Sequence, residues 1–418
     1  MLNEESIRKV DESCFSTHFR KPLYDSFCFS RIPATVSYLL TGEGKSEGLP
    51  ESCFDQGDYD GVILLFIDAF GWCFLEKYLS HPFIQRCLDK GILSKITTEF
   101  PSTTAAHVTT VHTGLEVGQS GIYEWFQYEP KVDKVIAPLL FSYAGDGMPN
   151  SLIASGMSPE EFFPFTTLYQ KLHLKKVDSF IFQESSINES PYSQAMSKGA
   201  HSVGYMNLAQ GLKSLSELFL TPRTNKTYAF FYHSHIDSVG HRKGVHHKAF
   251  EKSILYCLDL LEKELAPLLK SSKKIALLLT ADHGMVPVTP KKTIYVNKEM
   301  PHLVDWLDVK VPAGSCRDLF LSVKKEYLER AISEMSHLLQ GKAEVWKVET
   351  LIQKGFFGRV PVSQRFLERV GNVVILPYEN EAVWWFEPHK FQQNFYGSHG
   401  GLTPHEMETS FLFLPLRN

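Results

Sequence analysis

Residues 61–68 read GVILLFID, an uninterrupted apolar run that ends in an acidic residue. Similar runs recur as YAFFYH at 228–233, IALLLT at 275–280 and NVVILP at 372–377. Short runs that are apolar at nearly every position are typical of strands buried on both faces, as in a parallel sheet. Between them lie helical patterns, such as residues 248–270, with apolar positions three and four apart. The alternation predicts an α/β fold with a mostly parallel central sheet flanked by helices.

The chain of 418 residues is longer than a single hydrophobic core usually supports. Two stretches interrupt the alternation of strands and helices, the first rich in Ser, Pro and Phe, the second with its own order of strand, strand, helix and strand. We therefore expect cap segments inserted into a core. The predicted division is a first core part with an N-terminal extension at 1–123, an inserted segment at 124–220, core at 221–288, a small α+β insert at 289–395 and the core C-terminus at 396–418.

Composition and charge exclude several classes of protein. The net charge is −4 and no run of Lys and Arg exceeds a pair, so we expect neither a nucleic-acid duplex nor a membrane as a partner. No stretch approaches the roughly 20 apolar residues of a membrane-spanning helix. The first residues lack a secretory pattern and the seven cysteines lack CxxC spacing, which together predict a cytoplasmic protein with reduced thiols. The oligomeric state stays open.

Acidic and imidazole side chains follow the apolar runs at their carboxyl ends. In an open parallel sheet these ends share one edge, where ligands bind. Three carboxylates and three imidazoles from four places in the chain form donor sets suited to two divalent ions, Zn²⁺ or Mn²⁺. They are Asp68, Asp237, His241, Asp282, His283 and His399. Asp237 and His241 are one helical turn apart, whereas Asp68 is the natural partner of Asp282 and His283.

Each piece of this pattern has a simpler explanation when taken alone. An Asp at the end of a strand is often only the N-cap of the next helix. A DHG turn is often structural, and DxxGH arises by chance in many proteins. All six residues together favour the metal interpretation, because independent structural explanations would have to coincide.

The string FPSTTAAHVTTVHTG at residues 100–114 adds a hydroxyl to these donors. A proline-led turn precedes a run compatible with a helix that begins near Thr104. Backbone N–H groups and the helix dipole favour a phosphate at such an N-terminus. A neutral threonine is a poor nucleophile, but coordination to a divalent ion stabilises its alkoxide. The alternative is that Thr104 only caps the helix.

The sequence resembles the alkaline phosphatase superfamily and, within it, the type I phosphodiesterase/nucleotide pyrophosphatase branch. The resemblance spans about residues 60–416 and rests on five strings in the order of that branch: LLFIDAFGW, FPSTTAAH, HIDSVGHRKG, TADHGM and GSHGGLTPHEM. It implies two zinc ions. The implied ligands are Asp68, Thr104, Asp282 and His283 for one ion, and Asp237, His241 and His399 for the other.

The same resemblance implies that Thr104 attacks phosphorus, because the nucleophile of this branch stands three residues after the proline. It thereby selects Thr104 over Ser102 and Thr103. Nucleotide pyrophosphatases of the branch usually have Phe-Pro-Asn after the threonine, whereas His107 stands at the Asn position here. We expect His107 to donate to the phosphoryl group, and Tyr123 and Glu124 to contact the substrate.

Further polar residues have structural alternatives of equal or greater weight. His233 and His235 share a strand face and suit the core, or a place behind the metal ligands, better than ligation. Arg242 and Lys243 follow a predicted ligand and would meet either a substrate phosphate or solvent. Trp125 follows the nucleophile helix, where the branch has substrate contacts.

The sequence thus predicts a metal-dependent phosphohydrolase, most simply a phosphodiesterase or nucleotide pyrophosphatase that forms a covalent phosphothreonine. Its expected substrate is a small phosphoester, with nucleotides among the candidates. Two alternatives stay open. One is a phosphonate or phosphomonoester hydrolase on the same core, and the other is a non-catalytic relative that binds metal or phosphate.

Overall fold

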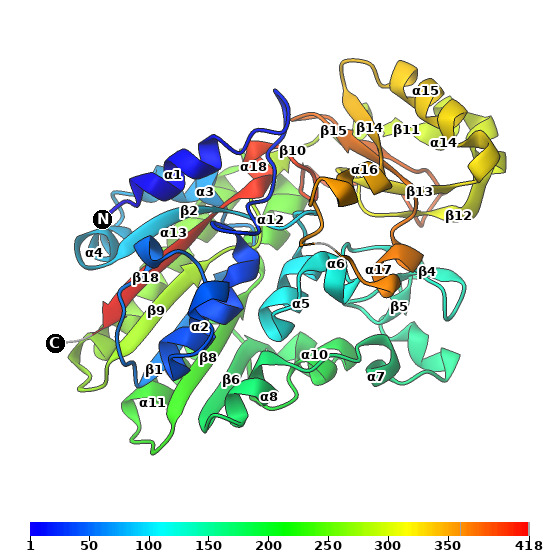
Figure 1. Cartoon of the computed structure of the whole chain (residues 1–418). Coiled ribbons are helices and arrows are strands. Elements are labelled where there is room, and N and C mark those ends of the chain that lie inside the picture. Colours follow the sequence, from blue (N-terminus) through cyan, green and yellow to red (C-terminus); the bar gives the residue numbers. More distant parts are fainter. Residues whose placement is uncertain (360, 417–418) are drawn as a thin grey trace.

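A seven-stranded sheet forms the centre of the computed structural model, which describes residues 1–359 and 361–416. Its strands are, in spatial order, β2 (Ile92–Thr97), β18 (Glu408–Leu416), β9 (Ile275–Thr280), β1 (Gly61–Ile67), β8 (Lys226–His233), β6 (Val177–Glu184) and β7 (His201–Tyr205). Neighbours from β9 to β7 are parallel, and β18 is antiparallel to both of its neighbours. The predicted α/β fold with a mostly parallel central sheet is confirmed (Figure 1).

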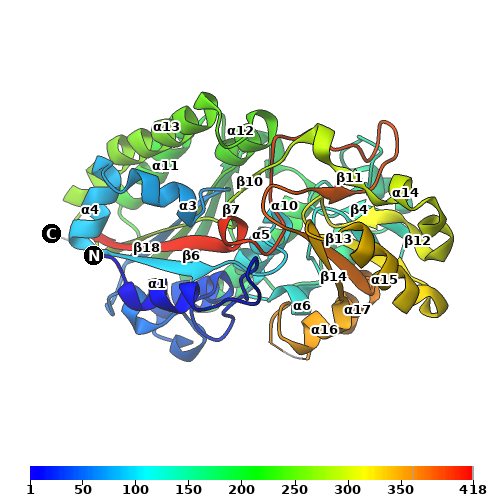
Figure 2. The same cartoon turned by 90° about the horizontal axis from the view of Figure 1, so that it is seen from above.

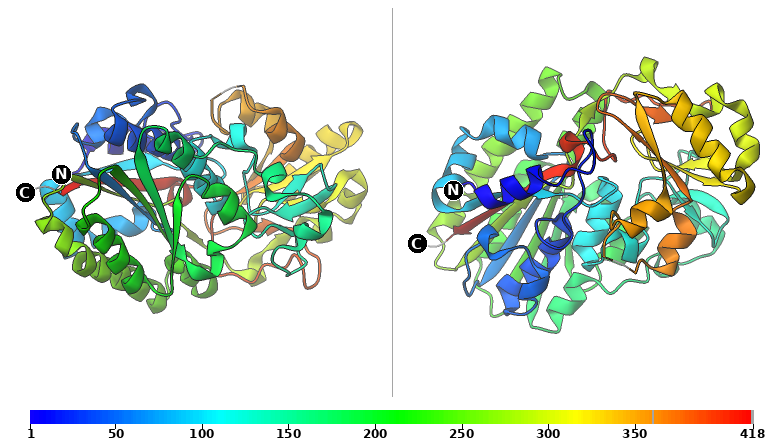
Figure 3. Two further views of the ribbon diagram at one scale, coloured as in Figure 1. Left: turned by 90° about the horizontal axis from the view of Figure 1, so that it is seen from below. Right: turned by 45° about the horizontal axis from the view of Figure 1, so that its top comes forward.

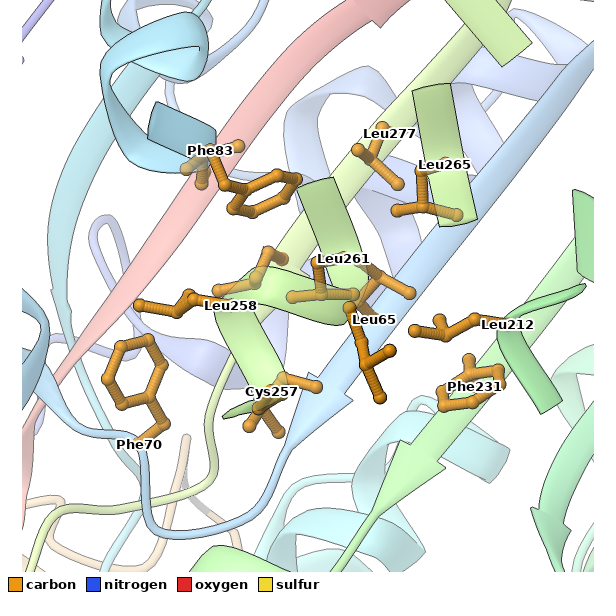
Figure 4. Close-up of a cluster of buried hydrophobic side chains, with 14 of the residues drawn as sticks. Leu65, Phe70, Phe83, Leu212, Phe231, Cys257, Leu258, Leu261, Leu265 and Leu277 are labelled. Carbon is orange, nitrogen blue, oxygen red and sulfur yellow. The ribbon is translucent and has the colours of Figure 1, made fainter. Parts of the chain in front are cut away.

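Helices cover both faces of this sheet (Figure 2). One face packs against α3 (Trp72–Leu75), α4 (Pro82–Lys90), α11 (Leu208–Leu220), α12 (His235–Lys243) and α13 (Lys248–Leu265). The other packs against α2 (Ile32–Thr41), α5 (Thr104–Thr113), α8 (Leu168–His173) and α10 (Pro191–Met196). Leu65 of β1 points into the first layer, beside Leu212 and Leu261 (Figure 4), and Leu64 into the second. This alternation explains why GVILLFI is apolar throughout.

The predicted inserted segment 124–220 is too long. Strands β6 and β7 fall within it, yet they extend the central sheet beyond β8. β6 contains Asp178 and Gln183, and β7 is a largely exposed edge strand, so neither forms an apolar run that the sequence would reveal. A separate three-stranded sheet, followed by α7 (Pro159–Phe162), makes up the inserted part; its strands are β3 (Gln127–Glu129), β4 (Lys134–Ala137) and β5 (Ser142–Tyr143).

The second predicted insert, 289–395, contains a small α+β unit with the expected order of elements. Its antiparallel sheet is ordered β12 (Leu307–Ala313), β13 (Leu319–Val323), β15 (Val373–Pro377) and β14 (Ala343–Lys347), with α15 (Leu328–Leu338) before β14. The interpretation of NVVILP as a strand of the parallel sheet is wrong, because it forms β15. Val373 and Val374 enter different apolar clusters, so this antiparallel strand is also buried on both faces.

The remaining elements are short, apart from α1 (Glu4–Asp11). They are α6 (Val117–Ser120), α9 (Ser185–Asn188), α14 (Val296–Glu299), α16 (Val348–Gln353), α17 (Gln364–Arg369), α18 (Pro404–Met407) and the strand pairs β10 (Val286–Pro287) with β17 (Gly397–Ser398) and β11 (Ile294–Tyr295) with β16 (Val383–Trp384).

None of the described helices has the length and apolar character needed to cross a membrane. All seven cysteines are among the described residues and carry free thiols. Residue 360 of the second predicted insert and residues 417 and 418 of the predicted core C-terminus lie outside the described residues.

The sheet brings distant parts of the chain to one edge. Ile67 pairs with His233 of β8, and Phe66 pairs with Thr280 of β9. The residues that follow these three strands therefore leave the sheet side by side. The segment before His399 joins them through β17, which pairs with β10 soon after β9. In both views of Figure 3 the small α+β unit lies beyond the central sheet, away from the N-terminus.

Candidate active site

Asp68, Thr104, Asp282 and His283 meet at the carboxyl edge of the central sheet. The Nε2 atom of His283 lies 3.2 Å from Thr104 Oγ1. It also lies 3.3 Å from Asp282 Oδ2 and 3.5 Å from Asp68 Oδ1. All four side chains are buried, and the two carboxylates and the imidazole are close enough to hold one metal ion. The structure brings together the first donor set as the sequence predicts.

Asp237, His241 and His399 form a second set beside the first. Asp237 Oδ1 lies 3.3 Å from His241 Nε2, one turn along α12, and 3.6 Å from His399 Nε2. The two imidazole Nε2 atoms are 3.2 Å apart. The sets adjoin, because donor atoms of Asp237, His283 and His399 also lie within 4.8 Å of one another.

Backbone carbonyls orient the three imidazoles. The Nδ1 atoms of His241, His283 and His399 lie 2.8, 2.9 and 3.0 Å from the carbonyl oxygens of Gly397, Gly284 and Ser102, respectively. A carbonyl accepts only, so each Nδ1 carries the proton and each Nε2 has a free lone pair. Hydrogen bonds of this kind fix the ring orientation of metal-binding histidines. Burial lowers the pKa of His283 and of His399 well below the usual value, which keeps both rings neutral.

Asp68 and Asp282 each accept hydrogen bonds on one carboxylate oxygen, and the other oxygen of each is free. Tyr232 donates its hydroxyl to Asp68 Oδ2 at 2.5 Å, and the N–H groups of Ala69 and His283 donate to Asp282 Oδ1 at 3.1 Å each. The other oxygens, Asp68 Oδ1 and Asp282 Oδ2, have no hydrogen-bond partner, and neither does Asp237 Oδ1. These three unpartnered oxygens are the ones that approach the imidazole Nε2 atoms.

Positive charge beside these three carboxylates would stabilise their ionised forms. Burial raises the pKa of Asp237 to about 6, and it raises the pKa of Asp68 and Asp282, with mutual repulsion adding to the shift of Asp68. Buried anions without partners cost free energy unless cations balance them. Oxygen and neutral nitrogen donors at these distances suit Zn²⁺ and Mn²⁺. The residues present therefore fit two divalent cations.

Thr104 is the first residue of α5, and Thr103 precedes it as the N-cap in an extended conformation. The hydroxyl of Ser102 is used elsewhere: it donates to the Gly401 carbonyl at 2.7 Å and accepts from the Gly400 N–H at 3.2 Å. Of these three adjacent hydroxyls, that of Thr104 contacts the donor sets. This geometry agrees with the choice of Thr104 over Ser102.

Two predicted substrate contacts point away from the site. His107 is fully buried; its Nε2 accepts from the Glu99 N–H at 2.9 Å, and its Nδ1 lies 2.7 Å from the Thr103 carbonyl. Both ring nitrogens are thus occupied by backbone. Tyr123 is fully buried against aromatic rings and donates its hydroxyl to the Arg369 carbonyl at 3.2 Å. The prediction that His107 and Tyr123 contact substrate is wrong, because both residues belong to the core.

Glu124, the third predicted substrate contact, does line a cavity next to Thr104. It is buried, its Oε1 has no hydrogen-bond partner, and burial raises its pKa to about 7. His233 is buried at the end of β8 outside both donor sets. The Arg242 guanidinium donates to the Ser238 carbonyl at 3.0 Å on an exposed surface. The structural interpretation thus holds for His233 and Arg242.

Two cavities meet at Thr104. We call them the Asp68 cavity, of about 520 Å³, and the His399 cavity, of about 400 Å³. Thr104, Trp125 and Asp237 line both. Most other wall residues of the His399 cavity come from the second predicted insert, and no local sequence pattern marks them because they converge only in the folded chain. Tyr232 was also missed, although it stands at the end of an apolar run.

Comparisons with known proteins give a family model and similar solved structures. A family model described as type I phosphodiesterase / nucleotide pyrophosphatase matches residues 62–402. Among solved structures, murine ectonucleotide pyrophosphatase/phosphodiesterase 5 is similar at 18% identity, covering 84% of this chain and 87% of that one, with a TM-score of 0.61. An inactive variant of the murine protein in complex with AMP is similar at 17% identity and a TM-score of 0.60, with the same coverage. The human counterpart is similar at 17% identity and a TM-score of 0.61, covering 84% of this chain and 87% of that one. A comparison with curated proteins gives no match.

Proposed function

The chain belongs to the type I phosphodiesterase/nucleotide pyrophosphatase family, whose members are hydrolases acting on phosphoester bonds, and we propose on that basis that it is a two-metal phosphodiesterase with Thr104 as its nucleophile. The observation that supports this most strongly is the position of Thr104. Its Oγ1 lies 3.2 Å from His283 Nε2, at the junction of two donor sets with three unpartnered carboxylate oxygens.

The two donor sets would hold one cation each. Asp68, Thr104, Asp282 and His283 would hold the first, and Asp237, His241 and His399 the second. When bound, two such cations stabilise negative charge on the attacking and departing oxygens of an in-line displacement. Zinc is our proposal for their identity, with manganese as the alternative.

The residues of this chain prepare the displacement in two ways. With a cation in the first donor set, the His283 Nε2 lone pair would bind it, and the Thr104 oxygen, 3.2 Å away, would bind the same ion, which favours attack on phosphorus by the alkoxide form. The N-terminus of the ten-residue helix α5 adds positive potential where a phosphoryl group would sit. The Thr104 hydroxyl loses its proton to water, and the bond from Oγ1 to phosphorus forms while the ester P–O bond breaks. The electron pair of the broken bond stays on the departing oxygen, which takes up a proton from water as the alcohol leaves. Water then cleaves the phosphothreonine.

The two cavities favour a diester over a monoester. A phosphodiester carries two organic groups, and cavities of about 520 and 400 Å³ open from Thr104. The murine relative binds AMP, so we propose a nucleotide diester as one candidate substrate. The phosphomonoester or phosphonate alternative would use only one of these spaces.

Parallel assays of bis(4-nitrophenyl) phosphate and 4-nitrophenyl phosphate test this proposal, with metal content measured on the same samples. We expect preference for the diester, loss of turnover in Thr104→Ala with metal largely retained, and partial activity in Thr104→Ser. Preference for the monoester would overturn the diesterase assignment. Metal binding without any turnover by the wild type would favour the non-catalytic alternative.

A further inference from the structure

We propose that the His399 cavity binds the group that departs from phosphorus, and that this group is a planar aromatic alcohol. The inference rests on the proposed function. It adds the identity of the leaving group and the residues that select it.

The position of the cavity relative to Thr104 gives the first step. In an in-line displacement the departing oxygen lies opposite the attacking Thr104 Oγ1. Thr104 belongs to the first donor set, so the departing oxygen faces the second set. Asp237, His241 and His399 all line the His399 cavity, whereas Asp68 lines only the other cavity. The leaving group therefore extends into the His399 cavity, and the group retained on phosphorus lies in the Asp68 cavity.

The walls of the His399 cavity are aromatic. Phe126 and Trp384 lie nearly parallel, at 19° with ring centroids 6.4 Å apart. Phe391 stands almost perpendicular to both, at 5.6 Å from Phe126 and 6.5 Å from Trp384. Phe126 precedes β3, whereas Trp384 and Phe391 come from the second insert, so the two inserts jointly form this surface. These rings pack on one another, and where they line the cavity they can make the same offset or edge-to-face contacts with a planar aromatic ligand.

Phe395 brings an aromatic face close to the reacting centre. Its ring centroid lies 4.7 Å from that of His241, yet 46% of the residue is exposed. Trp125, which lines both cavities, is 38% exposed. Large exposed aromatic side chains that line a cavity commonly mark ligand contacts.

The charge of the cavity argues against a pyrophosphate leaving group. Apart from the histidines of the second donor set, Lys390 is the cationic residue among the described lining residues, and its Nζ pairs with Glu387 at 2.7 Å. The buried Glu124 carboxyl also lines the space. A polyanionic group would need several cations here, whereas an aromatic alcohol needs none.

Phe395→Leu and Tyr396→Leu make a matched pair of variants. Leu at 395 keeps an apolar contact with His241 but removes the aromatic face. Tyr396 is 53% exposed and is not among the residues that line either cavity. Phe395→Tyr restores an aromatic ring, and Leu140→Ala alters the Asp68 cavity at a 41% exposed position.

The test measures 2-naphthol binding to the metal-loaded full chain by calorimetry, and KM for methyl 4-nitrophenyl phosphate. We expect Phe395→Leu to weaken naphthol binding and raise KM by about five- to ten-fold, consistent with one lost aromatic contact. Phe395→Tyr and Tyr396→Leu should stay within about two-fold of the wild type in both measurements, and Leu140→Ala should leave naphthol binding within about two-fold of the wild type. Wild-type naphthol binding by Phe395→Leu, or weakening by Leu140→Ala instead, would overturn the assignment. The calorimetry requires no turnover, so it decides the subsite even if the proposed hydrolysis fails.

Discussion

The imidazole rings of His283 and His399 stack with their centroids 3.5 Å apart and their planes at 11°. One follows β9 and the other follows β17, so this contact joins the two donor sets across a long stretch of chain. Thr104 lies at the same junction, with its hydroxyl on His283. This contact supports two adjacent metal sites, with Thr104 at the junction between them.

Removal of one ligand from either set should remove one metal ion. We expect Asp282→Asn and His399→Ala each to bind about one equivalent, against two for the wild type, because the remaining set keeps its donors. His246→Ala, at an exposed histidine outside both sets, is the control. Metal analysis after dialysis measures this. Two equivalents in both variants would show that these side chains are not ligands.

The hydrogen bond from Tyr232 to Asp68 should tune metal affinity. Tyr232→Phe removes the donor to Asp68 Oδ2, and we expect metal affinity to fall about 10- to 100-fold, as for other residues that orient metal ligands. Tyr228→Phe is a matched control on the same strand, since the buried Tyr228 hydroxyl has no hydrogen-bond partner. Competition with a fluorescent chelator gives both affinities. Equal loss in the two variants would point to general damage of β8.

Glu99 should make stability depend on pH. Burial raises its pKa to about 8 from an ordinary 4.5. A carboxyl with a raised pKa in the folded state stabilises the fold while protonated, and this contribution is lost as pH rises from about 4.5 through 8. The slope from this group is at most about 1.4 kcal/mol per pH unit. Glu99→Gln should flatten the decline and be the more stable form at pH 9, as urea unfolding would show. Parallel curves for the two proteins would contradict this.

The buried ion pair of Arg317 and Glu406 should stabilise the packing of the small α+β unit against the central domain. Arg317 donates from Nε and Nη2 to the two oxygens of Glu406 at 2.8 and 2.9 Å, and both side chains are fully buried. Arg317→Met leaves a buried carboxylate unpaired, which costs about 3–5 kcal/mol. The double variant with Glu406→Gln should recover part of that loss in denaturant unfolding. No recovery would mean that packing of Arg317, not charge, is what matters.

The sequence indicated the donor residues because each follows an apolar run or lies in a distinctive string. Neighbouring strands of a parallel sheet end at the same edge, so the sequence predicts that Asp68, Asp237 and Asp282 lie there, and the structure has them at that edge. The extent of the first insert was not predictable in this way. β7 is an exposed edge strand with no apolar pattern, and its pairing with β6 is set by tertiary context.

Substrate contacts were harder to predict than ligands. His107 is one turn after Thr104, but the whole of α5 is buried, so the residue after one turn meets the core. No local sequence pattern marks Trp384 and Phe395 as cavity residues, because they line the His399 cavity only when the second insert packs against the rest of the chain. The identity of the metal and the cytoplasmic location stay predictions from the sequence. The sequence makes no prediction of the oligomeric state.

The stereochemical course at phosphorus tests the account most directly, because it does not depend on the intermediate accumulating. A phosphorothioate diester of known configuration at phosphorus is hydrolysed by the metal-loaded enzyme in water enriched in oxygen-18, and the configuration of the labelled phosphorothioate monoester is determined. Each in-line displacement inverts phosphorus, so attack by Thr104 followed by attack of water gives net retention. Net inversion would mean that water attacks the substrate directly, and that Thr104 is not the nucleophile.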